Sequence, residues 1–169
     1  MKYLPFESIT YRTELPLEEV ITRLRKNIKE KKKFFDRSYH FDNFSQPYAG
    51  TLKENDFKIS REINYRNSFL PVISGRVEQE RKGTIISIKM RPHLAVLIFM
   101  VFWFSGVSIG ALAFTLPVLT GGDFEGASLI PVGMLVFGYL LTTLGFKYES
   151  KKSRKFFEEL FEVKKELRK

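Results

Sequence analysis

Residues 94–119 read LAVLIFMVFWFSGVSIGALAFTLPVL, residues 128–146 read SLIPVGMLVFGYLLTTLGF, and neither stretch contains a charged side chain. About 20 mostly apolar residues in a helix suffice to cross the hydrocarbon core of a membrane, which is about 30 Å thick. Only residues 120–127, TGGDFEGA, separate the two stretches. The sequence therefore predicts a transmembrane helical hairpin. The alternative is a pair of buried helices in a soluble protein, although such helices seldom run this far without a charge.

The basic residues that flank the predicted hairpin indicate its orientation. Lys and Arg close to a span stay on the cytoplasmic side, whereas acidic residues contribute little. Lys89 and Arg91 precede the first span, and the residues that follow the second include Lys147, Lys151, Lys152, Arg154 and Lys155. The turn carries Asp123 and Glu125 but no basic residue. We therefore expect both termini to be cytoplasmic and residues 120–127 to lie outside.

The composition argues against most enzymatic chemistry. The 169 residues carry a net charge of +9 and contain two histidines and no cysteine, which excludes disulfides, thiol nucleophiles and zinc–thiolate sites. No Gly-rich phosphate loop, HExxH motif or nucleophile elbow occurs. His40 and Asp42 share one face of a predicted strand, but no second His or Cys lies nearby to complete a metal site. We expect a non-catalytic protein that needs no cofactor and no metal.

Residues 1–93 are predicted to form a small β-rich cytosolic domain with one helix. Apolar and polar residues alternate from Phe57 to Tyr65, which is typical of a half-buried strand. Comparable runs predict further strands within residues 3–13, 37–44, 47–53, 69–80 and 84–90. Antiparallel pairing of consecutive strands would give a small sheet or a barrel.

Residues 17–34 are predicted to form an amphipathic helix. Leu17, Val20 and Leu24 recur at spacings of three and four, and the opposite face is basic. The basic residues that could contact lipid are Arg23, Lys26, Lys29, Lys32 and Lys33. This face is either simply solvated or in contact with anionic lipid headgroups. Each Lys or Arg near such headgroups strengthens membrane binding by about 1 kcal/mol. Nucleic acid is not expected as a partner, because a tethered basic face meets phospholipid first.

Residues 147–169 are predicted to form a second amphipathic helix, in the cytoplasm. Its apolar face, which includes Phe156, Phe157, Leu160 and Phe161, is too large to leave exposed. We expect this helix to pack on the domain formed by residues 1–93. The alternatives are that it lies in the membrane interface or pairs with another copy.

Small residues recur along both predicted spans and indicate where helices approach one another. Gly106, Gly110 and Ala113 share one face of the first span, and Gly138 and Gly145 belong to a similar stripe in the second. Such residues allow close contact between membrane helices. Either the two helices of one hairpin pack through them, or two copies do so and form a homo-oligomer.

The strings FKISR (57–61), INYRNSFLP (63–71) and MRPH (90–93), together with Gly75, resemble segments of small uncharacterised two-span bacterial membrane proteins. The resemblance implies a membrane location but no particular activity. A β-rich domain on a two-helix anchor is also similar in plan to membrane effectors of bacterial nucleotide-signalling defence, in which the spans precede the β-domain. Tyr65, Arg66 and Asn67 offer stacking and hydrogen-bonding groups to a partner or ligand, and a purely structural turn is the alternative.

Together these patterns predict an α+β membrane protein in a bacterial inner (plasma) membrane. Only Arg91, Pro92 and His93 separate the last predicted strand from the first span, so the domain should be held against the cytoplasmic surface. The expected function is a non-catalytic, membrane-anchored binding or scaffolding module. The alternative is a ligand-responsive effector that oligomerises through its hairpin and perturbs the membrane.

Overall fold

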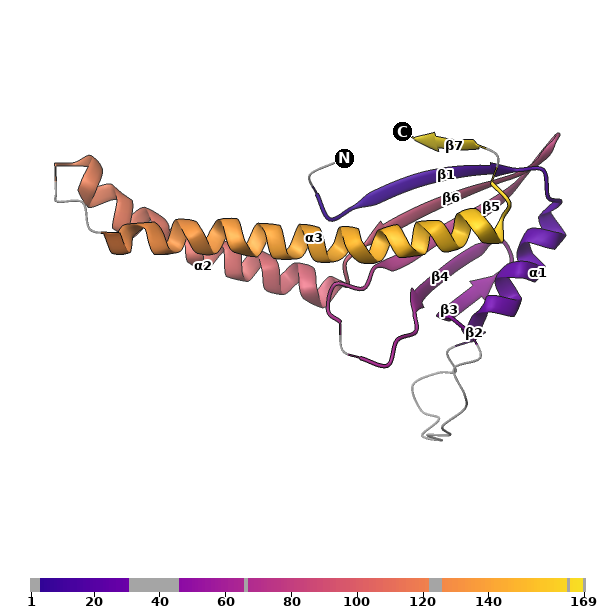
Figure 1. The fold of residues 1–169 in the computed structure, drawn as a ribbon, viewed down its shortest axis with the longest axis horizontal. Coiled ribbons are helices and arrows are strands. Elements are labelled where there is room, and N and C mark those ends of the chain that lie inside the picture. Colours follow the sequence, from indigo (N-terminus) through magenta and orange to yellow (C-terminus); the bar gives the residue numbers. More distant parts are fainter. Residues whose placement is uncertain (1–3, 31–45, 66, 122–125, 164, 169) are drawn as a thin grey trace.

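The computed structural model describes residues 4–30, 46–65, 67–121, 126–163 and 165–168, and it combines one β-sheet with two long helices that project from it (Figure 1). The strands are β1 (Glu7–Thr13), β2 (Ile28–Glu30), β3 (Tyr48–Lys53), β4 (Asp56–Arg61), β5 (Val72–Glu80), β6 (Gly83–Arg91) and β7 (Lys165–Arg168). The helices are α1 (Leu17–Asn27), α2 (Leu94–Leu119), the short 3-10 helix η1 (Gly126–Ser128) and α3 (Leu129–Leu160). The predicted α+β class is confirmed.

The sheet contains seven strands in the order β2-β3-β4-β5-β6-β1-β7. Strands β3 to β6 form an antiparallel meander, and β1 pairs with both β6 and β7. The prediction of a wholly antiparallel sheet is wrong at one edge, because β2 pairs with β3 in parallel after the α1 crossover. Among the described strands, β2 and β7 are the two ends of the ladder, so the sheet is open rather than closed into a barrel.

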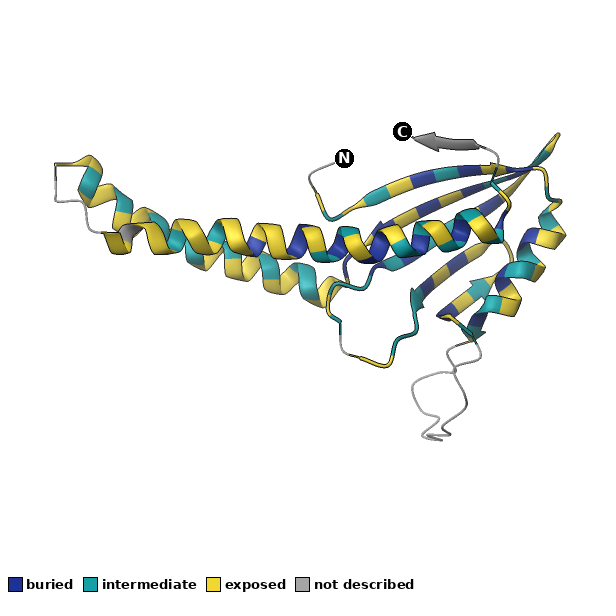
Figure 2. Cartoon of the chain, viewed as in Figure 1, coloured by how far each residue is buried: buried dark blue, intermediate teal, exposed yellow. Residues whose placement is uncertain are grey.

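The hydrophobic core lies between one face of the sheet and the helices α1 and α3. Alternate residues of β6 are buried, as expected for a strand with one covered face, and the helices bury single stripes (Figure 2). The Phe157 ring of α3 lies 5.6 Å from the Tyr48 ring and 6.2 Å from the Phe57 ring, measured between centroids. Gly75 is required beneath Phe57, because a Cβ at this position would overlap the ring.

Helix α1 is shorter than the predicted helix over residues 17–34. It ends at Asn27, and Ile28 takes the extended conformation (φ −114°, ψ 116°) and pairs with Tyr48. The apolar side chain of Ile28 is buried in either conformation, so periodicity alone does not distinguish a further helical turn from a strand. Residues 31–34 of the predicted helix lie outside the described residues.

Helix α3 joins two elements that the sequence predicts as separate. The predicted span over residues 128–146 and the first part of the predicted helix over residues 147–169 form one unbroken helix from Leu129 to Leu160. The prediction of helix beyond Leu160 is wrong, because residues 165–168 form a strand. No proline or glycine follows Gly145 within this helix, and the charged residues after Lys147 favour helix as well as the apolar ones before it. The chain then turns at Glu162 (φ 50°) and enters β7 beside β1.

Two helices among the described residues, α2 and α3, are long and apolar enough to cross a membrane. They lie side by side as a hairpin that extends away from the sheet (Figure 1). None of the residues of α2 is buried, whereas the second half of α3 runs across the sheet and is buried along one stripe (Figure 2). Helix α2 begins directly after β6, and the Nδ1 atom of His93 accepts the Ala95 backbone N–H at 3.3 Å as its cap.

Candidate functional site

A buried carboxylate marks the junction where α3 passes from the hairpin onto the sheet. The Glu149 side chain is only 3% exposed. It accepts hydrogen bonds from Arg61 Nη1 at 2.9 Å and from Asn67 Nδ2 at 3.2 Å, and the Tyr65 hydroxyl lies 3.5 Å away. The Lys152 ammonium lies 3.5 Å from the same carboxylate. Burial of a charge is costly unless it is paired and hydrogen-bonded, and Glu149 has both kinds of partner.

This arrangement assigns a structural role to two of the three residues that the sequence suggested as a ligand surface. Tyr65 and Asn67 contact Glu149, and Asn67 Oδ1 also accepts the Phe69 backbone N–H at 3.0 Å. The segment between β4 and β5 is therefore fixed to α3. The Tyr65 ring is still 55% exposed, so its use by a partner stays a prediction. Arg66, the third residue of the set, lies outside the described residues.

The small residues of the two long helices do not act as one set. Gly138 faces α2, because a Cβ added there would lie 3.5 Å from Trp103 Nε1 and from the Phe104 ring. Gly145 instead accommodates Phe69, whose ring would lie 2.9 Å from an added Cβ. Gly138 is thus matched by large aromatic side chains rather than by another small residue.

The small face of α2 is turned away from α3. An added Cβ at Gly106 or at Gly110 would meet no described residue of another segment within 4 Å, and Ala113 is exposed. The prediction that Gly106, Gly110 and Ala113 pack the two helices of one hairpin is therefore wrong for this chain, because the face of α2 that meets α3 is the one carrying Phe104. Contact with a second copy stays a prediction.

The basic face of α1 lies at the far end of the sheet from the hairpin (Figure 1). Arg23 donates to the Leu160 carbonyl at 2.9 Å and pairs with Glu19 at 2.9 Å and Glu162 at 2.7 Å. Hydrogen bonds to Glu19 and then Glu162 raise the pKa of Arg23. These contacts fix the C-terminal end of α3 rather than leaving Arg23 free for lipid.

The distance along α3 bears on the prediction that this basic face contacts lipid. Leu160 lies 14 residues beyond Phe146, the last residue of the apolar stretch, which is about 21 Å of helix. Charges act over about 8 Å at physiological salt. Lys26 is exposed and Lys29, in β2, is partly so, and their contact with lipid stays a prediction. Lys32 and Lys33 lie outside the described residues.

A different group of basic and amphipathic side chains surrounds the hairpin end of the sheet. Lys89 and Arg91, near the end of β6, are exposed, and Lys147 pairs with Glu7 of β1 at 2.8 Å. Large side chains are also exposed here, on the first residues before β1 and on α3 just beyond the apolar stretch: Leu4, Phe6 and Tyr148. This mixture of cations and apolar surface is typical of a membrane interface.

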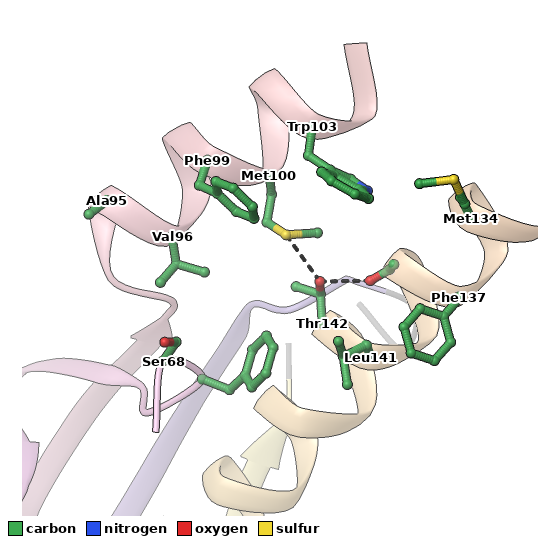
Figure 3. Close-up of a pocket in the computed structure, with 12 residues that line it drawn as sticks. Ser68, Ala95, Val96, Phe99, Met100, Trp103, Met134, Phe137, Leu141 and Thr142 are labelled. Carbon is green, nitrogen blue, oxygen red and sulfur yellow. Dashed lines mark hydrogen bonds between the residues drawn. The ribbon is translucent and has the colours of Figure 1, made fainter. Parts of the chain in front are cut away.

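An apolar cavity of about 700 Å³ lies between α2 and α3 at the same junction (Figure 3). Phe99 and Trp103 line it from α2, Phe137 and Leu141 line it from α3, and Phe69 lines it from the segment between β4 and β5. The Thr142 hydroxyl in its lining is already used, because it donates to the Gly138 carbonyl at 2.8 Å and lies 3.4 Å from Met100 Sδ. The cavity therefore suits an apolar occupant.

A second, polar cavity of about 500 Å³ adjoins the first and shares Ser68 and Val96 with it. Arg61, Glu62 and His93 line this cavity. Because His93 Nδ1 accepts a backbone N–H, the neutral ring carries its proton on Nε2 and presents a donor there. No cluster of three or more potential metal ligands exists within the described ranges.

Sequence reasoning missed Glu149 and both cavities. The one local signal was an acidic residue placed among Lys147, Lys151 and Lys152 directly after an apolar stretch. The cavities had no such signal, because they arise where residues about 40 positions apart are brought together.

Comparison of the chain with protein-family models, with curated proteins and with solved structures gave no match.

Proposed function

We propose that the chain is a non-catalytic binding or scaffolding module anchored in a bacterial inner membrane. Helices α2 and α3 cross the membrane, and the sheet is held at the cytoplasmic surface. The observation that carries this proposal is the continuity of α3, which runs without a break from the apolar hairpin into the core of the sheet domain. A helix shared in this way fixes the domain relative to its anchor.

The dimensions of the hairpin support insertion. The apolar part of α3, residues 129–146, is about 27 Å long at 1.5 Å per residue, close to the hydrocarbon thickness of about 30 Å. Helix α2 is about 39 Å long and would fit by tilting. Large apolar side chains cover its surface, and Phe102 is 79% exposed. An apolar surface of this extent needs hydrocarbon or protein around it.

The charge distribution supports the proposed orientation. Lys89 and Arg91 lie before α2, and Lys151 and Lys152 follow the apolar part of α3. Cations concentrated at this end of the hairpin support a cytoplasmic location for it. The exposed Phe6 and Tyr148 are suited to the headgroup region. We infer that this end of the domain rests on the membrane, whereas α1 points into the cytoplasm.

The proposed role follows from the rigid attachment. Two connections join the sheet to the hairpin: the two residues between β6 and α2, Pro92 and His93, and α3 itself, which Glu149 ties to Arg61. Neither connection offers a flexible linker, so the domain presents its surfaces at a fixed height above the bilayer. The exposed ring of Tyr65 is the first place to look for a partner.

The absence of cysteine allows a direct test of topology. Ala127→Cys places a thiol in the turn between the long helices, and Lys151→Cys places one beyond the apolar part of α3, both at exposed positions. A membrane-impermeant maleimide added to intact cells should label the first variant and should label the second only after lysis. The protein should also stay in the membrane pellet after alkaline carbonate extraction. Release by carbonate, or equal labelling of both variants, would contradict the proposal.

A second candidate function is a membrane effector that assembles through its hairpins. The open surface at Gly106 and Gly110 supports it, since no other part of the described chain lies within 4 Å of an added Cβ there. If this function holds, overexpression collapses the membrane potential, and Gly106→Leu relieves the effect. A matched change at Gly133, which is equally open but lies on α3, should not relieve it. A harmless protein that stays monomeric in mild detergent would rule this function out.

A further inference from the structure

We propose that the junction binds one phospholipid with an amine-bearing headgroup, whose acyl chain fills the apolar cavity and whose phosphoethanolamine group occupies the polar one. The inference rests on the proposed insertion of α2 and α3 in a membrane, which would surround the junction with lipid. It adds a specific ligand to the proposed role of the junction in membrane anchoring.

The apolar cavity has the size and chemistry of a lipid-chain site. Its volume of about 700 Å³ lies within the range of about 300–1,000 Å³ that is usual for small-molecule sites. Phe99, Trp103 and Phe137 contribute to a lining without charged side chains, and the Thr142 hydroxyl is satisfied within the protein. Water in such a cavity finds few hydrogen-bond partners, whereas a hydrocarbon chain has no hydrogen bonds to lose on entering it.

The position of the cavity matches the depth of one leaflet. Its lining on α2 begins at Ala95, one residue after the start of the helix, and reaches Trp103. Eight residues of helix correspond to about 12 Å, so the cavity extends from the headgroup level into the upper part of the acyl region. A chain that enters here leaves its headgroup beside the first turn of α2.

The polar cavity lies where that headgroup would be. Ser68 and Val96 line both cavities, which therefore adjoin. On the polar side, His93 offers the Nε2 proton and Arg61 its guanidinium, of which one nitrogen is bound to Glu149. These donors suit phosphate oxygens. The arrangement matches an amphiphile rather than a wholly apolar or wholly polar ligand.

Glu62 decides the headgroup class. It lines the polar cavity, and its Oε2 atom is buried and has no hydrogen-bond partner among the described residues. The Arg61 charge is already balanced by Glu149, and Glu62 forms no ion pair with any of the described residues. An ammonium group supplies both the charge and the N–H donors that this carboxylate lacks. Choline has no N–H to donate, and phosphatidylglycerol brings a negative charge and no cation.

Trp103 provides a built-in probe, because it is the only tryptophan in the chain and it lines the apolar cavity. Full-length protein in detergent micelles is titrated with phospholipids that carry brominated acyl chains, which quench tryptophan on contact. Brominated phosphatidylethanolamine should quench Trp103 in a saturable manner at about one lipid per protein. The phosphatidylcholine and phosphatidylglycerol analogues should need about tenfold more lipid, the loss expected for charge-assisted hydrogen bonds. Quenching that follows the mole fraction of brominated lipid equally for all three would overturn the proposal.

Two variants separate the chain site from the headgroup site. Ala95→Phe places a ring at the entrance of the apolar cavity from an exposed helix position and should abolish saturable quenching. Ala113→Phe adds the same ring on an exposed part of α2 away from the cavity and should leave quenching unchanged. Glu62→Gln should retain quenching but make the ethanolamine and choline lipids equivalent. Equal behaviour of the two alanine variants, or an unchanged headgroup preference in Glu62→Gln, would contradict the assignment.

The outcome is independent of the topology experiment. Quenching is measured in detergent and does not depend on how the hairpin inserts in cells. A protein that is labelled as expected but shows no saturable quenching retains its proposed membrane anchoring and loses the lipid site. A protein that carbonate releases from the membrane but that shows saturable quenching would lose its proposed anchoring and retain the lipid site. If size-exclusion chromatography shows that Ala95→Phe is misfolded, Glu62→Gln still tests the lipid site, because this substitution preserves the shape of the side chain.

Discussion

Helices α2 and α3 have similar apolar sequences but different roles in the molecule. Helix α2 contains 26 residues, and none of them is buried. Helix α3 contains 32 residues, and its second half supplies buried residues such as Phe146, Glu149 and Phe157 to the sheet domain. The difference lies in the flanking sequence. Pro92 and His93 separate α2 from β6, so α2 begins as a new helix at Leu94. No proline or glycine follows Gly145 within α3, which continues to Leu160. The end of an apolar stretch is therefore not the end of a helix.

The largest effect is expected where α3 enters the core. Phe157→Ala removes a fully buried ring that lies against Tyr48, Phe57 and Phe161, and it should lower the free energy of unfolding by about 3–5 kcal/mol. Phe102→Ala, at a 79% exposed position of α2, should change it little in detergent. Chemical denaturation of both variants, followed by circular dichroism, measures the difference. Equal losses would show that the two helices contribute equally to the domain.

A smaller effect is expected at the buried carboxylate. Glu149→Gln keeps the side-chain shape but removes the charge that Arg61 and Asn67 face, which should cost about 1.5–3 kcal/mol of unfolding free energy. Glu159→Gln is the matched control, because Glu159 is 69% exposed and pairs loosely with Lys155 at 3.8 Å. It should cost about 0.5 kcal/mol or less. If Glu159→Gln lowered the unfolding free energy as much as Glu149→Gln, the buried carboxylate would have no special role in stability.

The glycines test the same comparison with a single methyl group. Gly145→Ala brings a Cβ to 2.9 Å from the Phe69 ring, and the resulting overpacking should outweigh the gain in helix propensity and destabilise the fold by about 1 kcal/mol. Gly106→Ala has open space around it and should be neutral or stabilising by up to about 1 kcal/mol. Thermal unfolding in detergent distinguishes the two signs. Destabilisation by Gly106→Ala would indicate a contact with another copy.

The smallest effect concerns the tyrosine that α3 covers. Burial raises the pKa of Tyr48, so the folded state holds this proton more tightly than the unfolded chain does. Its contribution to stability is complete below the unfolded pKa of about 10 and is lost as the pH rises above that value. The free energy of unfolding should therefore fall as the pH rises above about 10, and Tyr48→Phe should lack this fall. Identical alkaline slopes for the two proteins would show that α3 does not seal Tyr48 from water.

Much of the fold could be predicted because its signals are local. Alternation along residues 57–65 predicted β4, although the strand ends at Arg61. The charge-free run over residues 94–119 predicted α2 with the same bounds. The prediction failed at Ile28, where a buried apolar residue satisfies a helix and a strand equally well. It failed again at Lys147, because a change from apolar to charged residues marks a change of surroundings and not a change of backbone conformation.

The sequence by itself determined the apolar hairpin, the basic residues at its ends and the strand-forming character of the domain, since each depends on neighbours within a few residues. Only the tertiary structure decided that Glu149 meets Arg61, 88 positions away, and that Gly145 makes room for Phe69. The two adjoining cavities have the same origin. Contacts between distant segments depend on how α3 is laid across the sheet, and no local pattern records that direction.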